Sequence, residues 1–222
     1  MDHGADPSRA QEGRTAVAMA ARRGRGDILA LFRDRGTSMA LDGVDSLIGA
    51  CAMDDGDAIE AIRQTAPHLV TELQSLDGTV LAEFAGNGNT EGVRHLLDLG
   101  VDAGAVFEQG DGYWGLAPRS TPLHVAAWRM RPTVVALLIM RGAPVEARDR
   151  WNRTPLALAI KACVDSYWSE RRTPDSVAAL LAAGASVDGI MYPSGYDEVD
   201  ELLREHGAGT RLNHPETRAQ ED

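Results

Sequence analysis

A repeated segment constrains this chain more than any other feature of its sequence. The stretch Ser120-Thr121-Pro122-Leu123-His124-Val125-Ala126-Ala127 is followed by an apolar run, and thirty-three residues after Thr121 the pattern restarts at Thr154-Pro155-Leu156. Threonine can cap a helix and proline suits its first turn, where no backbone donor is required. Residues 134–140 carry apolar side chains at helical spacing, and Gly142 follows where a left-handed residue is favoured. We expect a unit of short helix, turn, longer helix and glycine stop.

This unit resembles the ankyrin repeat, whose signature is a Thr-Pro-Leu-His-x-Ala-Ala helix followed by a Leu-Leu-x-x-Gly-Ala stop. The resemblance implies an all-α solenoid of stacked helix-turn-helix units with protruding β-hairpin fingers, in which each unit contacts only its neighbours. It also implies that His124 bonds to backbone between neighbouring repeats. We expect a bacterial-type array of five to six repeats. Residues 3–7 look like the tail of a preceding repeat, which favours a fragment of a longer array.

The repeat boundaries follow from matching the rest of the chain to this unit. A single domain is expected over residues 1–209, followed by a polar, disordered tail at 210–222. The expected repeats are approximately 12–40, 41–70, 77–105, 119–149 and 150–188, with a C-terminal cap at 189–209. No glycine ends the second repeat, so Ala66-Pro67 should end its outer helix, because proline cannot continue a helix.

Two insertions of nine residues interrupt the period. The first lies between Gly100 and Thr121, so the finger at 104–118 should be longer than usual and fold over the concave side. The second follows the inner helix of the fifth repeat. Residues 161–172 contain no glycine or proline, so this helix should continue for about two turns beyond its usual end.

All four tryptophans fall in the half of the array that carries the insertions. In ankyrin geometry the fingers and the ends of the inner helices line the concave groove, so these rings should converge. They could form an interface hot spot or a small satellite core beneath the insertions, or both. The predicted binding residues are Tyr113, Trp114, Trp128, Arg129, Trp151, Asp165, Tyr167, Trp168, Arg171 and Arg172.

The charges near this cluster are net basic, and arginine–carboxylate pairing could receive an acidic segment of a partner. The alternative is a solvated face. The patch comprises Arg129, Arg131, Arg148, Arg150, Arg153, Lys161, Asp165, Glu170, Arg171 and Arg172. A second arginine-rich run, at 22–25, is expected to be a solvated turn between helices rather than an anion-binding patch.

Three functions are compatible with this reading. We favour a scaffold that binds an unidentified protein in its concave groove. A second possibility is a small-molecule-binding or weakly hydrolytic pocket beneath the finger at 104–118, with Asp165, His124 and Glu83 as acid–base candidates. The third is a spacer within a longer array. No catalytic motif is present, so an enzyme is not favoured. Zinc-binding Cys and His motifs are absent from the sequence, so no metal or cofactor is expected.

The composition of the chain limits which kinds of partner and which cellular compartment are expected. The net charge of −11 argues against nonspecific binding to nucleic acid or to an anionic membrane. The longest apolar run is far shorter than the roughly 20 residues that a membrane-spanning helix needs. Cys51 and Cys163 are expected to be two reduced thiols, and the predicted location is cytoplasmic.

Overall fold

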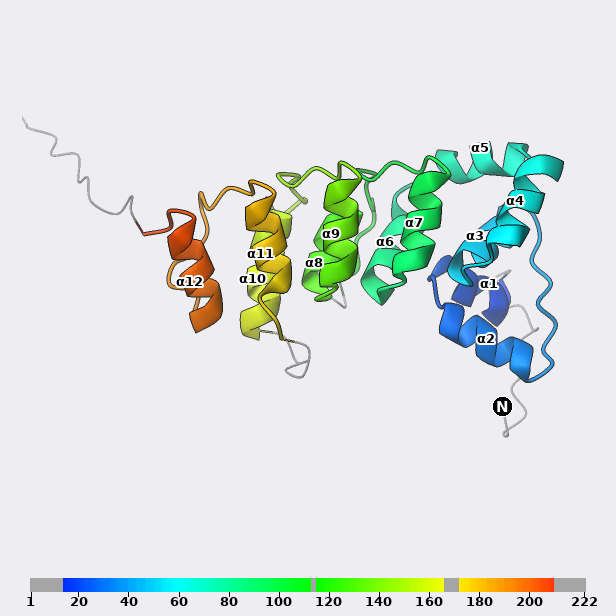
Figure 1. Ribbon diagram of the computed structural model, residues 1–222, viewed down its shortest axis with the longest axis horizontal. Helices are drawn as coiled ribbons and strands as arrows, with labels where there is room; N and C mark the ends of the chain where they lie inside the picture. The colour runs from blue at the N-terminus through cyan, green and yellow to red at the C-terminus, as the bar shows by residue number, and fades with distance from the viewer. Residues whose placement is uncertain (1–13, 113–114, 166–171, 210–222) are drawn as a thin grey trace, which may run out of the picture.

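The structure, a computed structural model, describes residues 14–112, 115–165 and 172–209. Within these residues the chain forms a row of helix pairs connected by loops (Figure 1). The helices are α1 (Ala16–Arg22), α2 (Gly26–Asp34), α3 (Val44–Ala52), α4 (Gly56–Thr65), α5 (His68–Ser75), α6 (Thr79–Asn87), α7 (Thr90–Asp98), α8 (Pro122–Trp128), α9 (Pro132–Met140), α10 (Pro155–Asp165), α11 (Asp175–Ala182) and α12 (Asp197–Glu205). None of the helices in the described ranges is long and apolar enough to cross a bilayer.

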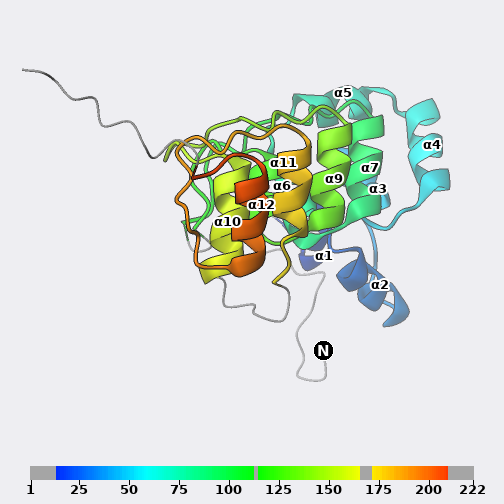
Figure 2. The same ribbon diagram turned by 60° about the vertical axis from the view of Figure 1, so that its left-hand side comes forward.

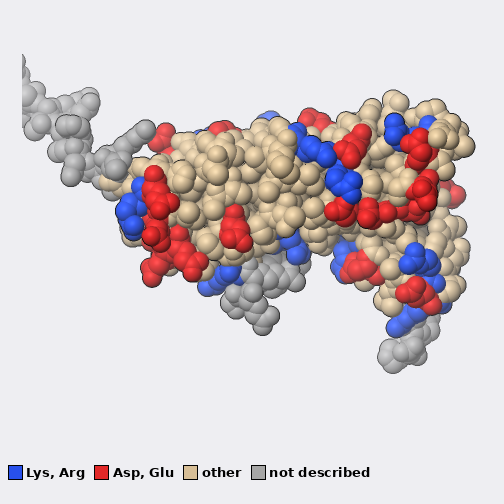
Figure 3. Space-filling model, viewed as in Figure 1, with Lys and Arg blue, Asp and Glu red and all other residues tan. Residues whose placement is uncertain are grey.

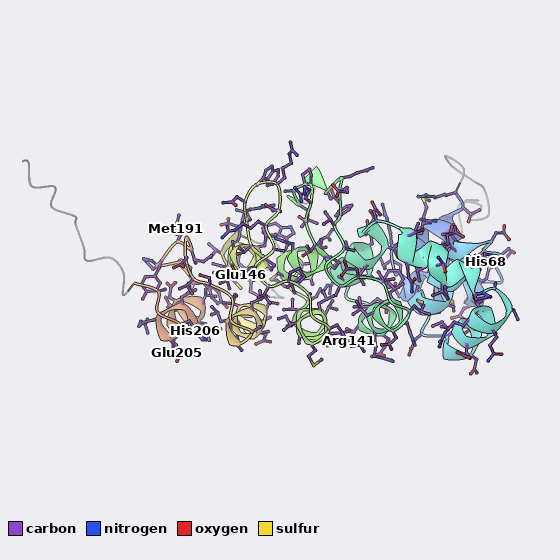
Figure 4. The ribbon with its side chains drawn as sticks, turned by 90° about the horizontal axis from the view of Figure 1, so that it is seen from above. His68, Arg141, Glu146, Met191, Glu205 and His206 are labelled. Atoms are coloured by element: carbon purple, nitrogen blue, oxygen red, sulfur yellow. The ribbon has the colours of Figure 1, made fainter. Side chains whose placement is uncertain are left out.

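From α6 onward the helices stack in two layers. The inner helices α6, α8 and α10 pack side by side, and α7, α9 and α11 form an outer row (Figures 2 and 4). The loops that connect successive pairs project beyond the inner row, as the view from above shows (Figure 4). Close packing is possible because α8 buries small residues, including Ala126 and Ala127, against its neighbours. We call the side that carries the inner helices and these loops the inner face.

The first two repeats do not continue this stacking. Helices α1 and α2 lie across the direction of the upright helices α6 to α11 (Figure 1). Helix α1 packs on α3 but also touches α6, whereas α3 makes its main contact with the third repeat through the outer helix α7. The expectation that each unit contacts only its neighbours is therefore wrong here, because the first repeat contacts the third.

Glycine and asparagine at the inter-helix turns allow this contact. Gly24 is buried with a φ of +64°, and a Cβ at this position would lie 2.6 Å from the ring of Phe84. The Asn89 amide Nδ2 donates to the carbonyls of Gly24 (2.8 Å) and Ala52 (2.9 Å), and its Oδ1 accepts from the Gly92 N–H (2.9 Å). One side chain thus joins three repeats. Of the turn at 22–25, which was expected to be solvated, Arg23 is exposed but Gly24 is buried in this contact.

Two further elements differ in part from expectation. Helix α4 ends at Thr65 as predicted, but Pro67 is the N-cap of α5, a helix that the repeat pattern did not indicate. Helix α5 is held by Leu69 and Leu73, which are four residues apart and both buried. Helix α10 has 11 residues where α8 has 7, which agrees with the predicted extension as far as Asp165. The rest of that extension, together with the two ends of the chain, lies outside the described residues.

Candidate functional site

The long finger turns back on itself and lies over the inner helices. The Phe107 N–H donates to the Ser120 carbonyl (2.7 Å), and further out Asp111 and Leu116 exchange two backbone hydrogen bonds of 2.9 Å each. Phe107 and Leu116 are buried in a small cluster with Ala82 of α6, Val125 of α8 and Leu158 of α10. Because the cluster includes one residue from each of these inner helices, the finger packs against three repeats.

The next finger is shorter and is ordered by one buried carboxylate. Asp149, whose side chain is fully buried, accepts from the backbone N–H groups of Trp151 and Arg153 (2.9 Å each) and from the Arg153 Nε (2.8 Å). The Arg153 Nη2 also donates to the carbonyl of Gly115 in the long finger (3.1 Å). The same guanidinium lies 4.4 Å above the centre of the Trp151 ring. One arginine therefore joins the two fingers and supports an indole.

The histidine of the Thr-Pro-Leu-His motif connects the fourth repeat to the fifth. His124 is completely buried, its Nδ1 accepts from the Thr121 N–H (3.1 Å), and its Nε2 lies 3.0 Å from the Arg153 carbonyl. A carbonyl can only accept, so Nε2 carries the proton and the ring is neutral. Burial lowers the pKa of His124, against the opposing influence of the Arg153 carbonyl. The hydrogen bond to the Arg153 carbonyl therefore fixes the position of the backbone at the start of the next repeat.

Residues 119–150 match the family model for the ankyrin repeat. This is an ankyrin-repeat protein. The chain is 38% identical over 108 residues to serine/threonine-protein kinase 12 of Arabidopsis thaliana, and 34% identical over 119 residues to the B-cell lymphoma 3 protein of Homo sapiens. The matches cover 46% and 52% of this chain, but it spans only 22% of each relative's length. The bacterial type stays a prediction.

The structure places two of the four tryptophans of this ankyrin-repeat protein, and both lie beside the same segment of the long finger. A Cβ at Gly115 would be 3.7 Å from the Trp128 ring, and Gly115 is joined to Trp151 through Arg153. Trp128 is half-buried against the cluster under the finger, as a satellite core requires, whereas 55% of Trp151 is exposed, as a binding surface requires. The predicted binding residues that lie outside the described residues are Tyr113, Trp114, Tyr167, Trp168 and Arg171.

Basic side chains outnumber acidic ones in the segment 147–153 that carries Trp151. Arg119, Arg148 and Arg150 are all exposed, and the one acidic residue among 147–153 is Asp149, which is buried and paired with Arg153. Arg119 was missed in the sequence because it directly follows the long finger, and only folding brings this part of the chain beside the shorter finger. Arg119 has a left-handed φ of +63° where the finger rejoins the array, and only the structure shows this feature.

The other predicted binding residues in the described part of the chain differ from Trp151 in burial or in pairing. Arg129 is half-buried, and burial lowers its pKa while Glu83 and Asp111 oppose that shift. Asp165 is exposed but paired with the Nζ of Lys161 at 2.5 Å, one helical turn away. Arg172 is exposed. Of the predicted set, Trp151 is the exposed aromatic side chain among the described residues.

The three acid–base candidates are not assembled into one site in the described part of the chain. His124 is sealed in the core with both ring nitrogens engaged, so neither can reach a substrate. Glu83 lines a cavity under the long finger, and burial raises its pKa against the lowering influence of Arg23 and Arg129. Asp165 lines a separate cleft at the end of α10. The groups lie on three helices and face different surroundings.

The described residues also leave little room for a ligand beneath the long finger. The cavity there measures about 20 Å³, which is enough for roughly one water molecule. Within the described ranges no three His, Cys, Asp or Glu side chains are placed to hold a metal ion.

Proposed function

We propose that this ankyrin-repeat protein binds another protein through its fingers, with Trp151 as the central contact and an acidic segment of the partner over the neighbouring arginines. Ankyrin repeats indicate a protein–protein interaction scaffold. The observation that supports this particular surface is the exposed Trp151 ring beneath the Arg153 guanidinium, 4.4 Å away. Tryptophan and arginine are the residue types that most often dominate binding energy at interfaces.

The rigidity of the finger supports the same proposal. Asp149 holds the backbone of Trp151 and both the backbone and the side chain of Arg153. A side chain that is already ordered loses less conformational entropy when a partner binds, commonly by about 0.5–1.5 kcal/mol per ordered side chain. The fold itself gains little from an indole that is more than half exposed, so binding explains its position better than packing.

The charge distribution supports an acidic partner. The outer face carries acidic side chains over α12 and few charges over α9 and α11 (Figure 3). On a chain of net charge −11, the segment 147–153 has three arginines and one acidic residue, the buried Asp149. The net negative charge would disfavour an acidic segment overall, while the exposed Arg119, Arg148 and Arg150 would attract it locally. The complex should therefore weaken as the salt concentration rises.

The test compares single variants as bait. The full chain would capture partners from native lysate, and the captured protein would then be titrated against Trp151→Ala and Arg150→Glu. We expect each variant to lose about tenfold or more in affinity, the cost of roughly 1.4 kcal/mol or more. Met140→Ala is a matched control, because Met140 is 75% exposed on the outer helix α9. Unchanged affinity of Trp151→Ala, with unchanged circular dichroism, would show that the fingers are not the site.

A further inference from the structure

A cleft of about 550 Å³ opens where the first repeat meets the third. It is lined by α1, by the start of α6 with the residues before it, and by the base of the long finger. In a regular stack the inner helix of the second repeat would pack beside α6. Here α3 lies on α7 instead, and α1 makes a small contact with α6. The cleft is therefore a consequence of the irregular stacking of this chain rather than part of the groove along α6, α8 and α10.

Apolar side chains line both walls of the cleft. Met19 is 41% exposed on α1, although four of the seven residues of that helix are buried. Across from it lie Leu76, Val80 and Phe107. Met19 is one of few large apolar side chains so exposed in the described ranges, and a flexible thioether adapts its shape to different apolar partners. A large apolar side chain of a ligand would bury Met19 against the already buried Val80 and Phe107.

The α1 wall of the cleft is basic. It carries Arg14, Arg22 and Arg23, of which Arg22 is paired with Asp45 at 2.6 Å and the other two are exposed. The opposite wall has two acids. The Asp77 Oδ1 accepts from the Thr79 N–H at 3.1 Å, and Glu83 is half-buried near Arg23 and Arg129. The cleft thus combines apolar side chains on both walls with exposed cations on the α1 wall.

We propose that this cleft is a second docking site for an extended peptide segment of a partner protein, which places a large apolar side chain on Met19 and a carboxylate against Arg14 and Arg23. Nucleic acid fits poorly, because Asp77 and Glu83 on the opposite wall would repel a row of phosphates, whereas a single carboxylate needs to contact only the α1 wall. The volume is sufficient for a few side chains, within the range of roughly 300–1,000 Å³ that is typical of binding clefts. This site lies at the opposite end of the inner row from Trp151, so it does not depend on the function proposed above.

A displayed library of random peptides, selected on the full chain, tests the proposal. We expect enrichment of peptides with an acidic residue close to a large apolar one. Their affinity should fall about tenfold or more in Met19→Lys and in the double variant Arg14→Glu, Arg23→Glu. Lysine forms helices about as well as methionine, so the first variant should fold, and circular dichroism checks this.

Two controls separate this site from the fingers and from nonspecific contacts. Met140→Lys makes the same chemical change on the outer helix α9 and should leave the affinity unchanged. Trp151→Ala should also bind the selected peptides normally. The proposal is wrong if no peptide is enriched on the native chain relative to Met19→Lys. It is equally wrong if the selected peptides bind Met19→Lys as well as the native chain, or if they depend on Trp151 instead.

Discussion

At the scale of single residues, buried polar side chains carry information that their sequence positions only partly reveal. His124 was assigned from its motif to a bond between repeats, and its contacts with Thr121 and Arg153 agree with that role. Asn89 lies in a turn that looked ordinary in the sequence, yet its amide reaches carbonyls 65 and 37 residues away. No local pattern distinguishes such an asparagine from a solvated one.

His124 should make the stability of this protein depend on pH. Burial lowers its pKa in the folded state below the value of about 6.5 in the unfolded chain. As the pH falls below about 6.5, His124 binds a proton in the unfolded state but not in the native state. The free energy of unfolding therefore decreases. The stabilisation is complete above that pH and is lost toward the lower, folded pKa, at most by about 1.4 kcal/mol per pH unit.

Urea unfolding at several pH values between about 7.5 and 5.5 checks this expectation across the unfolded histidine pKa. His124→Gln should be less stable at neutral pH by about 1–3 kcal/mol, because buried partners lose their hydrogen bonds, and it should lack this part of the pH dependence. His206→Gln is a suitable control, since His206 is exposed. A pH dependence in His124→Gln equal to that of the native chain would contradict the assignment.

At the scale of elements, the repeat pattern predicted the helix pairs well and their connections less well. Threonine caps and glycine stops depend on residues within one turn of a helix, so α8 and α9 begin and end close to where the sequence indicates. Helix α5 has no place in the repeat and was missed. The long finger was expected to fold over the inner side, and Phe107 and Leu116 do so, but their partners come from three separate helices.

Two glycines at turns allow the contact between the first and third repeats to be tested. Gly24 and Gly36 both have left-handed φ angles, +64° and +72°, so alanine costs about 1 kcal/mol at each for backbone strain. A Cβ at Gly24 would also lie 2.6 Å from Phe84, whereas nothing lies within 4 Å of one at Gly36. We expect Gly24→Ala to lower the free energy of unfolding by about 2 kcal/mol more than Gly36→Ala does, as measured by urea unfolding. Equal losses would mean that the contact is loose in solution.

At the scale of the whole molecule, the two cysteines report on the two ends of the array. Cys51 on α3 and Cys163 on α10 are both buried, and burial raises their thiol pKa values to about 12 and about 11. Both thiols should resist a thiol reagent at mildly alkaline pH until the structure around them opens. Because α6, α8 and α10 stack continuously and the first two repeats do not join that stack, Cys51 should react at a lower urea concentration than Cys163.

The measurement is labelling with a chromogenic disulfide reagent across a urea titration. Cys51→Ala and Cys163→Ala variants assign each reacting thiol. If both thiols are labelled with the same urea midpoint, the first two repeats unfold together with the regular stack, and the expected order is wrong. Earlier labelling of Cys163 would place the weaker end of the array at the fifth repeat and reverse the expected order.

The thirty-three-residue spacing, the Thr-Pro starts and the glycine stops were sufficient to predict the family, the all-α class and the helix pairs of the central repeats. These features are local, since a cap or a helical stripe depends on neighbours within a few positions. The contact of α1 with α6, the packing of the finger over the inner helices and the exposure of Trp151 were decided by tertiary structure. Each of these depends on close packing and hydrogen bonds between residues far apart in the chain, and such contacts have no periodic signature in the sequence.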